Sequence, residues 1–274
     1  MTTVAVVMPI GSADAYLRST LRSIDQQDFR DFELIAVCAS DRVGAVDGVI
    51  RSVGPGFPFK VLGARLPGFS FALNLGIEHV RGEFVARWDA DDLCDPSRLR
   101  RQLEAFRADP LLGVVGTRVT LIDSAGEPIP GHAFKFFGGD REIRRALRYR
   151  QPIAHSAVMF RTKTLFDARG YAYGNSSEDH ELYIRLARNR GIRFMNLPDV
   201  TTYYRRHPDQ VTALGGQYRQ FCDIAGFMTT EFLLTGNPMY VVGAVASAPI
   251  MRRGRSVVRR VNGLLFRKNR GRRD

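Results

Sequence analysis

The stretch FVARWDADDLCDP, residues 84–96, begins as an apolar run typical of a buried β-strand and ends in a group of aspartates. Asp89, Asp91 and Asp92 fall within four positions, and Asp95 follows shortly after them. In open α/β sheets, ligands bind outside the carboxyl ends of the strands. The stretch therefore predicts a sheet strand with a ligand site at its carboxyl end. We expect Asp95 to act separately, as the N-cap of the next helix.

The chain around this stretch alternates short β-rich runs with amphipathic helical segments. This alternation is typical of βα units and a largely parallel sheet, so it predicts the α/β class. We expect strands at residues 3–9, 32–38, 59–64 and 83–89, one or two strands at 112–123, and helices at 14–27, 69–82 and 95–110. Gly82 is expected to close the second of these helices. The glycine patterns of dinucleotide folds and P-loops are absent from the sequence.

The composition limits the class of protein. With 274 residues, 45% of them hydrophobic, the chain can bury a substantial core. Its three cysteines lack paired spacing, which argues against a disulfide framework or a cysteine zinc site and indicates a reducing compartment. The N-terminus has no basic region before its short apolar run, so it does not resemble a signal peptide. We therefore expect a cytoplasmic protein.

The aspartate group allows three interpretations. Turn and capping chemistry is the simplest. A calcium loop would use Asp89 and Asp91 as its first and third positions, but Cys94 and Arg100 stand where the sixth and twelfth positions need glycine and glutamate. The third interpretation is a Mg²⁺ or Mn²⁺ site serving a substrate phosphate, since these cations bind few carboxylates and fill their other positions with water and phosphate oxygens. Spacing alone leaves the metal site and a solvated acidic turn as alternatives.

A second acidic group lies in residues 174–191, which are expected to form a helix with Ser177 as its N-cap and Gly191 at its end. Asp179 shares a face with apolar residues three, four and seven positions later, so it is expected to point inward. An inward carboxylate can act as a general base towards a hydroxyl. The alternative is that acids in a first helical turn only interact with the helix dipole, which accounts well for Glu178.

Residues 203–212, YYRRHPDQVT, end a β-like run with Arg205, Arg206 and His207. These residues are either a solvated strand end or phosphate contacts, with the imidazole as a further metal ligand. Another histidine, His155, precedes an apolar strand and is expected to be a hydrogen-bonded core or rim residue.

These segments together resemble the inverting family 2 glycosyltransferases, which have the GT-A fold. The resemblance covers residues 3–212, in order. VAVVMPIGSADAYLRSTLRSIDQQDFRDFELIAV is similar to the opening strand, helix and second strand, and GFSFALNLGIEHVRGEFVARWDADD to the Ala-x-Asn-x-Gly and Asp-x-Asp region. SEDHELYIRL resembles the Glu-Asp stretch, and YRRHPDQVT the closing Tyr-Arg-x-His segment. The resemblance implies a mostly parallel central sheet flanked by helices, and hexosyl transfer from a nucleotide-sugar with inversion.

The resemblance also implies roles for the matching residues. Asp89 and Asp91 would hold Mg²⁺ or Mn²⁺ and the donor diphosphate, with His207 as a further metal ligand. Asp179 would be the catalytic base. Further donor contacts are expected from Pro9, Asp41, Asn74 and Arg206. The acceptor would be a glycan or a lipid-linked glycan, as in polysaccharide or cell-envelope biosynthesis.

Two segments differ from the family pattern. Cys38, Ala39 and Ser40 stand where an aspartate usually contacts the nucleotide base, and Asp41 is the nearest replacement. The Tyr-Asn pair that usually follows the proline of the first strand is absent. These changes leave the donor nucleotide open, and a catalytically silent scaffold with the GT-A fold remains the alternative function.

The chain is expected to divide into a GT-A domain at residues 1–215 and a helical, basic extension at 216–274. Residues 251–274 contain ten Lys or Arg and one acid, which accounts for +9 of the net charge of +12. The apolar run at 239–251 is too short to span a bilayer, whereas 256–266 has the pattern of a basic amphipathic helix. We expect this tail to bind an anionic membrane surface on the inner face of the cell membrane. A solvated tail or an RNA-binding tail is the alternative, although the body of the chain shows no basic, aromatic-rich face and no nucleic-acid partner is expected.

Overall fold

The computed structural model describes residues 2–131, 134–172, 177–207 and 217–248. Its strands are β1 (Val4–Pro9), β2 (Phe32–Ala39), β3 (Phe59–Ala64), β4 (Phe84–Arg87), β5 (Leu93–Cys94), β6 (Leu112–Ile122), β7 (Met159–Arg161) and β8 (Arg193–Arg205). Its α-helices are α1 (Ala15–Asp25), α2 (Val43–Val53), α3 (Phe69–Glu78), α4 (Arg98–Ala108), α5 (Asp140–Ala146), α6 (Thr162–Asp167), α7 (Glu178–Arg188), α9 (Gln217–Thr235) and α10 (Met239–Ser247). Two short 3₁₀ segments are η1 (Ser40–Arg42) and η2 (His155–Ala157).

The strands form one sheet in the order β3-β2-β1-β4-β7-β6-β8-β5. β3, β2, β1 and β4 run parallel to one another, whereas β7 is antiparallel to both β4 and β6. Because parallel strands point the same way, the carboxyl ends of β1, β2 and β4 lie at one edge of the sheet. This arrangement confirms the predicted α/β class and its largely parallel sheet.

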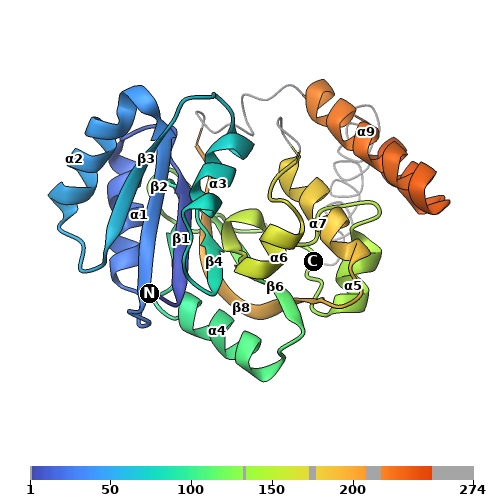
Figure 1. Cartoon of the computed structure of the whole chain (residues 1–274), viewed down its shortest axis with the longest axis horizontal. Coiled ribbons are helices and arrows are strands. Elements are labelled where there is room, and N and C mark those ends of the chain that lie inside the picture. The colour runs from blue at the N-terminus through green and yellow to red at the C-terminus, as the bar shows by residue number, and fades with distance from the viewer. Residues whose placement is uncertain (1, 132–133, 173–176, 208–216, 249–274) are drawn as a thin grey trace, which may run out of the picture.

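Helices cover both faces of the sheet (Figure 1). In β1, Val4, Val6 and Met8 belong to an apolar core with residues of α1, α2 and α4. Ala5 and Val7 belong to a second core with residues of α3, α6, α7 and α9. The strand is therefore buried on both faces, which explains why it reads as a continuous apolar run in the sequence.

The role expected for Gly82 is wrong. Helix α3 ends at Glu78, four residues earlier, with His79 in the C-cap position. Gly82 instead lies against the backbone that leads into β1. A Cβ atom at this position would come within 2.8 Å of the carbonyl oxygens of Thr2 and Thr3. Glycine is needed here for the close approach of two backbone segments and not for a helix end.

The expected N-cap role of Asp95 is also wrong. Helix α4 begins at Arg98, and Ser97 occupies the N-cap position. The Oδ1 atom of Asp95 accepts hydrogen bonds from Ser97 N at 2.9 Å and from Ser97 Oγ at 2.5 Å. Asp95 therefore stabilises the turn that precedes α4 and is not the N-cap of that helix.

The helix predicted at residues 174–191 is shorter than expected. As α7 it begins after Ser177, as predicted, but it ends at Arg188. Asn189 has an extended backbone conformation, and its Oδ1 accepts a hydrogen bond from Gly191 N at 2.8 Å. This side-chain hydrogen bond stabilises a turn in place of another helical turn.

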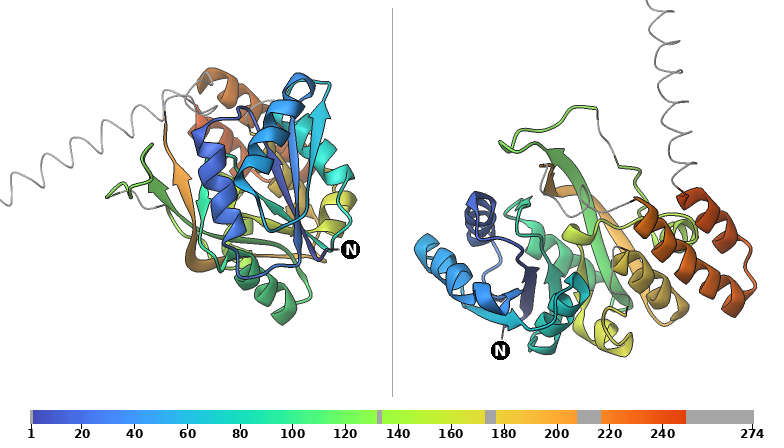
Figure 2. Two further views of the ribbon diagram at one scale, coloured as in Figure 1. Left: turned by 90° about the vertical axis from the view of Figure 1, so that its left-hand side faces the viewer. Right: turned by 90° about the horizontal axis from the view of Figure 1, so that it is seen from above.

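Beyond β8, the chain forms a helical hairpin of α9 and α10, interrupted at 236–238 as its Gly-Asn-Pro sequence indicates. The hairpin lies at the side of the molecule opposite α2 (Figures 1 and 2). None of the described helices is long and apolar enough to cross a membrane. The basic amphipathic segment predicted at 256–266 lies outside the described residues, and the division at residue 215 stays a prediction.

Candidate active site

The carboxyl ends of β1, β2 and β4 bring several predicted site residues to one edge of the sheet. Pro9, the last residue of β1, is buried and pairs with Val37 of β2. Asp41 lies in η1 just beyond β2, and its side chain is exposed. The neighbouring Arg42 donates a hydrogen bond to the carbonyl of Gly11, which joins the loops that follow β1 and β2. Two loops proposed to contact the donor are therefore held together at this edge.

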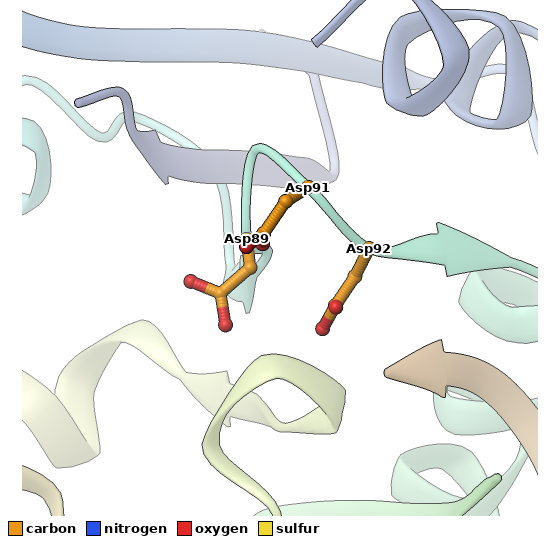
Figure 3. Close-up of side chains that lie close together, drawn as sticks. All are labelled: Asp89, Asp91 and Asp92. Atoms are coloured by element: carbon orange, nitrogen blue, oxygen red, sulfur yellow. The ribbon is translucent and has the colours of Figure 1, made fainter. Parts of the chain in front are cut away.

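The aspartates that follow β4 form a compact cluster at the same edge. Asp89, Asp91 and Asp92 each offer a carboxylate oxygen, and these oxygens lie within 4.8 Å of one another (Figure 3). Asp89 and Asp91 are half-buried, whereas Asp92 is fully buried. We name these three residues the acidic cluster. No other group of three or more metal-binding side chains occurs in the part of the chain that the structure describes.

Arg87, the last residue of β4, balances part of this negative charge. Its side chain is buried, and its Nη1 lies 2.5 Å from Asp89 Oδ1. Its guanidinium also lies over the ring of Phe69, 5.0 Å from the ring centre. A buried arginine needs a partner charge, so the pair holds both Arg87 and Asp89 in place. Arg87 was not expected from the sequence, although its position two residues before Asp89 on a buried strand is a usable signal.

Asp92 connects the acidic cluster to the end of β8. Its Oδ1 accepts a hydrogen bond from Arg205 N at 2.9 Å, and its carbonyl accepts one from Thr20 Oγ1 at 2.8 Å. Burial, followed by the charges of Asp89 and Asp91, raises the pKa of the Asp92 carboxyl well above its usual range. A bound cation would oppose this rise because it favours the ionised form. Asp92 is therefore the fully buried member of the cluster.

The Tyr-Arg-Arg-His segment reaches the acidic cluster, as the sequence analysis expected for His207. The Nε2 atom of His207 lies 3.0 Å from Asp91 Oδ2, and its ring lies 4.8 Å from the ring of Tyr16. The two arginines differ. Arg205 is buried and donates from Nε to the Asp91 carbonyl at 2.8 Å, whereas Arg206 is exposed. The arginine that contacts the cluster is Arg205, whereas the donor contact expected from the sequence for Arg206 stays a prediction.

The donor set of this cluster fits a hard divalent cation. It consists of carboxylate oxygens with one imidazole nitrogen, and Mg²⁺ and Mn²⁺ prefer oxygen ligands. The cluster is also partly exposed, which leaves room for water or phosphate oxygens to complete the coordination. The structure brings Asp89 and Asp91 together with Asp92, and His207 contacts Asp91, whereas the assignment of Asp89, Asp91 and His207 as cation ligands stays a prediction.

Asn74 has a structural task in addition to any donor contact. Its Nδ2 donates to the Tyr171 carbonyl and its Oδ1 accepts from Tyr171 N, both at 2.8 Å. A Cβ atom on Gly170, where φ is +63°, would come within 2.4 Å of Asn74 Oδ1. The amide therefore fixes the position of Tyr171, and a glycine before Tyr171 is required for this contact.

Tyr171 continues into a chain of buried polar groups. Its hydroxyl lies 3.0 Å from His155 Nε2, and His155 Nδ1 lies 3.2 Å from the hydroxyl of Tyr183 on α7. Burial, followed by the charge of Arg87, holds the pKa of His155 well below its usual range. His155 is therefore neutral and hydrogen-bonded on both sides, which confirms the prediction of a satisfied core or rim histidine.

The first turn of α7 carries Glu178 and Asp179, and both are half-buried. Asp179 Oδ1 accepts a hydrogen bond from His180 N at 2.7 Å, and the apolar residues predicted to share its face are buried. Burial, followed by the charge of Asp179, raises the pKa of Glu178 to about 7, and Arg87 and Asp89 also act on it. The start of α7 therefore faces the Arg87–Asp89 pair. The dipole explanation for Glu178 was incomplete because only tertiary packing buries this side chain.

In the presence of EDTA, Glu178→Gln is expected to raise the free energy of unfolding at pH 8 by about 1–3 kcal/mol. The folded-state pKa of about 7 lies above the ordinary value of 4.5, so ionisation of Glu178 opposes folding. The penalty is absent below the unfolded pKa, develops as the pH rises between the two values, and is complete above the folded pKa. Urea unfolding at pH 5 and pH 8 measures it, with the exposed Glu127→Gln as the control. A variant that gains no stability at pH 8 would contradict this assignment.

Comparison with known proteins shows the family to which this chain belongs. The model of glycosyl transferase family 2 matches residues 5–170, which is more than half of the chain. Among characterised relatives, the O-antigen biosynthesis glycosyltransferase WbnJ of Escherichia coli is 28% identical over 239 residues, covering 84% of this chain and 89% of that protein. The amylovoran biosynthesis glycosyltransferase AmsE of Erwinia amylovora is 30% identical over 149 residues, covering 54% of each.

Solved structures support the same fold. The S. aureus protein TarS (residues 1–349), determined in complex with UDP-GlcNAc, superposes with a TM-score of 0.62 at 19% identity, covering 84% of this chain and 66% of that one. The mannosyltransferase PcManGT of Pyrobaculum calidifontis, in complex with GDP-Man and Mn²⁺, superposes with a TM-score of 0.61 at 17% identity, covering 90% and 74%. At these identities the likeness establishes the GT-A fold alone. Because the family model spans the strands that carry the acidic cluster, this chain belongs to glycosyl transferase family 2.

Proposed function

We propose that the protein transfers a sugar from a nucleotide-diphospho-sugar to a hydroxyl of a glycan or lipid-linked acceptor, with inversion at the anomeric carbon. The observation that carries this proposal is the acidic cluster with His207, located at the carboxyl edge of the sheet. Ligand binding at this edge is the rule for open α/β folds. The complexes of TarS with UDP-GlcNAc and of PcManGT with GDP-Man and Mn²⁺ support a nucleotide-sugar and a divalent cation as the ligands.

In this proposal, the loops after β1 and β2 bind the nucleoside. Pro9 forms one wall of its site, and Asp41 is the polar group at the position where the base would lie. Asn74 contacts the donor with the part of its amide that Tyr171 leaves free. Asp89 and Asp91 would hold Mg²⁺ or Mn²⁺ beside the donor diphosphate, with His207 as a further ligand. When bound, the cation supplies positive charge that stabilises the departing nucleoside diphosphate.

Arginines supply fixed positive charge near the same place. Arg87 and Arg205 are buried at the acidic cluster, and Arg206 is the exposed arginine next to His207. We assign Arg206 to the donor phosphates, since an exposed guanidinium can bind phosphate oxygens bidentately. Arg87 and Arg205 position the aspartates and do not themselves need to touch the donor.

Asp179 acts as the general base in this scheme. It removes the proton of the acceptor hydroxyl as the oxygen attacks the anomeric carbon from the face opposite the leaving group. One such displacement forms the new glycosidic bond, breaks the bond to the diphosphate, and inverts the configuration. The half-buried position of Asp179 at the start of α7, beside Glu178, supports this role.

The names of the relatives suggest the pathway class. WbnJ and AmsE are glycosyltransferases of O-antigen and amylovoran biosynthesis, so we propose an acceptor in the biosynthesis of a cell-envelope polysaccharide. We further propose that the enzyme works in the cytoplasm, on the inner face of the cell membrane, with the basic residues of 251–274 attracted to anionic lipid headgroups.

A donor panel tests the proposed function directly. With Mn²⁺ present, one class of uridine, guanosine or thymidine diphospho-sugar should raise the melting temperature by about 5 °C or more at a hundredfold excess over Kd. EDTA should remove the shift because the cation links the donor diphosphate to the cluster. If no donor class shifts the melting temperature with Mn²⁺, the chain is a catalytically silent member of the family and the proposal fails.

A further inference from the structure

An exposed apolar surface covers the end of the α9–α10 hairpin. Six of its large side chains are exposed, with Leu233 at 76% and Val245 at 54% of their full surface. We define the hairpin face as Leu233, Leu234, Met239, Val241, Val242 and Val245. They lie in the last turn of α9 and along α10, and this hairpin is at the outer edge of the molecule (Figure 2). Concentrated apolar exposure of this kind marks an interaction site.

The hairpin is firmly attached to the rest of the protein. On α9, the ring of Phe227 packs edge-on against His180 of α7 at 5.3 Å. The buried Glu231 forms an ion pair with Arg188, the last residue of α7, with Nε and Oε2 3.2 Å apart. Ile224, Phe227 and Met228 belong to the apolar core beneath the sheet. These contacts fix the orientation of the hairpin face relative to the rest of the protein.

Helix α10 exposes several of its apolar side chains to solvent. Gly243 is its inward residue, since a Cβ atom there would meet the Arg148 carbonyl at 2.2 Å and Met228 Sδ at 2.8 Å. With about 100° between successive residues, Val241 and Val245 lie on the side opposite Gly243, Val242 lies on the flank, and all three are exposed. A water-facing helix carries polar residues on that side. No charged residue occurs anywhere in 232–251.

The charge of the following sequence indicates what covers this face. Residues 251–274, which follow α10 closely in the chain, carry ten Lys or Arg and one acid. An apolar face combined with a dense positive charge matches an anionic lipid bilayer, whose headgroups attract the cations while its acyl region accepts the apolar side chains. A second copy of this chain would bring an equal positive charge to the same place, and the repulsion opposes that pairing.

We propose that the hairpin face inserts into the interfacial layer of an anionic membrane and orients the enzyme on it. This goes beyond attraction by the basic tail, because the insertion belongs to described residues of the folded body. It deepens the proposed membrane location, but binding to lipid requires neither donor nor transfer. The failure of one proposal can therefore be measured apart from the failure of the other.

Sedimentation of the full chain with vesicles of phosphatidylcholine and phosphatidylglycerol tests the insertion. The triple variant Leu233→Gln, Leu234→Gln and Val242→Thr should bind these vesicles with an affinity lower by about tenfold or more. The reason is that the loss of apolar insertion weakens an interfacial anchor. The control Leu111→Gln with Phe166→Gln changes residues exposed elsewhere and should bind like the wild type. Equal binding by the triple variant would overturn the proposal. The donor-induced melting shift should be the same in all three proteins.

A fluorescent reporter gives a second measurement that does not depend on weakening the surface. Trp88 is the only tryptophan of the chain and is fully buried, so its signal is a constant background. In Val242→Trp, vesicles should shift the emission to the blue, and brominated lipids should quench it, whereas Leu111→Trp should show neither effect. A blue shift that grows with protein concentration without vesicles would mean that a second copy covers the face. If the emission is blue-shifted regardless of vesicles and of protein concentration, another part of the same chain covers the hairpin face. Either of these two results overturns the proposal.

Discussion

Asp91→Asn is expected to reduce sugar transfer by about 10²–10³-fold. Asp91 lies in the acidic cluster and is paired with His207 at 3.0 Å, so its charge serves both the proposed cation and the histidine. Asparagine keeps the size of the side chain but removes that charge. The variant should therefore bind the nucleotide more weakly in Mn²⁺ and should require a higher Mn²⁺ concentration for residual activity. Initial rates over a Mn²⁺ titration measure both effects.

Asp95→Asn is the matched control for Asp91→Asn. Asp95 lies four residues later, just beyond β5, and its carboxylate accepts hydrogen bonds from Ser97 instead of joining the cluster. Its replacement should leave the Mn²⁺ titration unchanged, since an amide oxygen can accept the same hydrogen bonds. Wild-type activity and an unchanged Mn²⁺ requirement in Asp91→Asn would show that the cluster does not hold the cation through this residue.

Asp179→Asn is expected to lower kcat by about 10²–10⁴-fold while leaving donor binding intact. The amide cannot take a proton from the acceptor hydroxyl, but it can still accept the hydrogen bond from His180 N that the carboxylate accepts at 2.7 Å. The fold and the acidic cluster should therefore be unaffected. Single-turnover rates with saturating donor, together with the donor-induced melting shift in Mn²⁺, separate the chemical step from binding.

Glu178→Gln is the informative neighbour for Asp179→Asn, because the two carboxyls are adjacent and both half-buried at the start of α7. If Asp179 is the base, Glu178→Gln should retain far more activity than Asp179→Asn. The reverse order would move the base to Glu178, whose pKa of about 7 suits proton transfer near neutral pH. Full activity in Asp179→Asn would eliminate its assignment as the base.

The predictable parts of the fold are those that local patterns encode. The strands β1 to β4 and the helices α1 and α3 were expected within a few residues, because period-two and period-3.6 apolar patterns are properties of short segments, whereas helix α2 was not expected. The boundary errors at Gly82 and Asp95 have different causes. Gly82 lies against the backbone before β1, a contact between residues far apart in the chain, whereas Asp95 forms a local turn with Ser97 and the helix begins after it.

The candidate site shows the same division. The sequence by itself predicted Asp89, Asp91, Asp179 and His207 as candidate site residues. A carboxylate group after a buried strand, an inward acid in the first turn of a helix and a histidine after a later strand are recognisable patterns. Only the tertiary structure showed that Arg205 contacts the cluster, gave Asp92 its buried position, and paired Arg87 with Asp89.

The hairpin face was also beyond the sequence. From the sequence, the apolar run at 239–251 is too short to span a bilayer, and the outward orientation of Val241 and Val245 depends on how α10 packs through Gly243. The physical reason is the same in each case. Apolar periodicity and turn chemistry act between residues close in the chain, whereas burial, ion pairing and exposure arise between residues as far apart as Asp92 and Arg205, 113 positions along the chain.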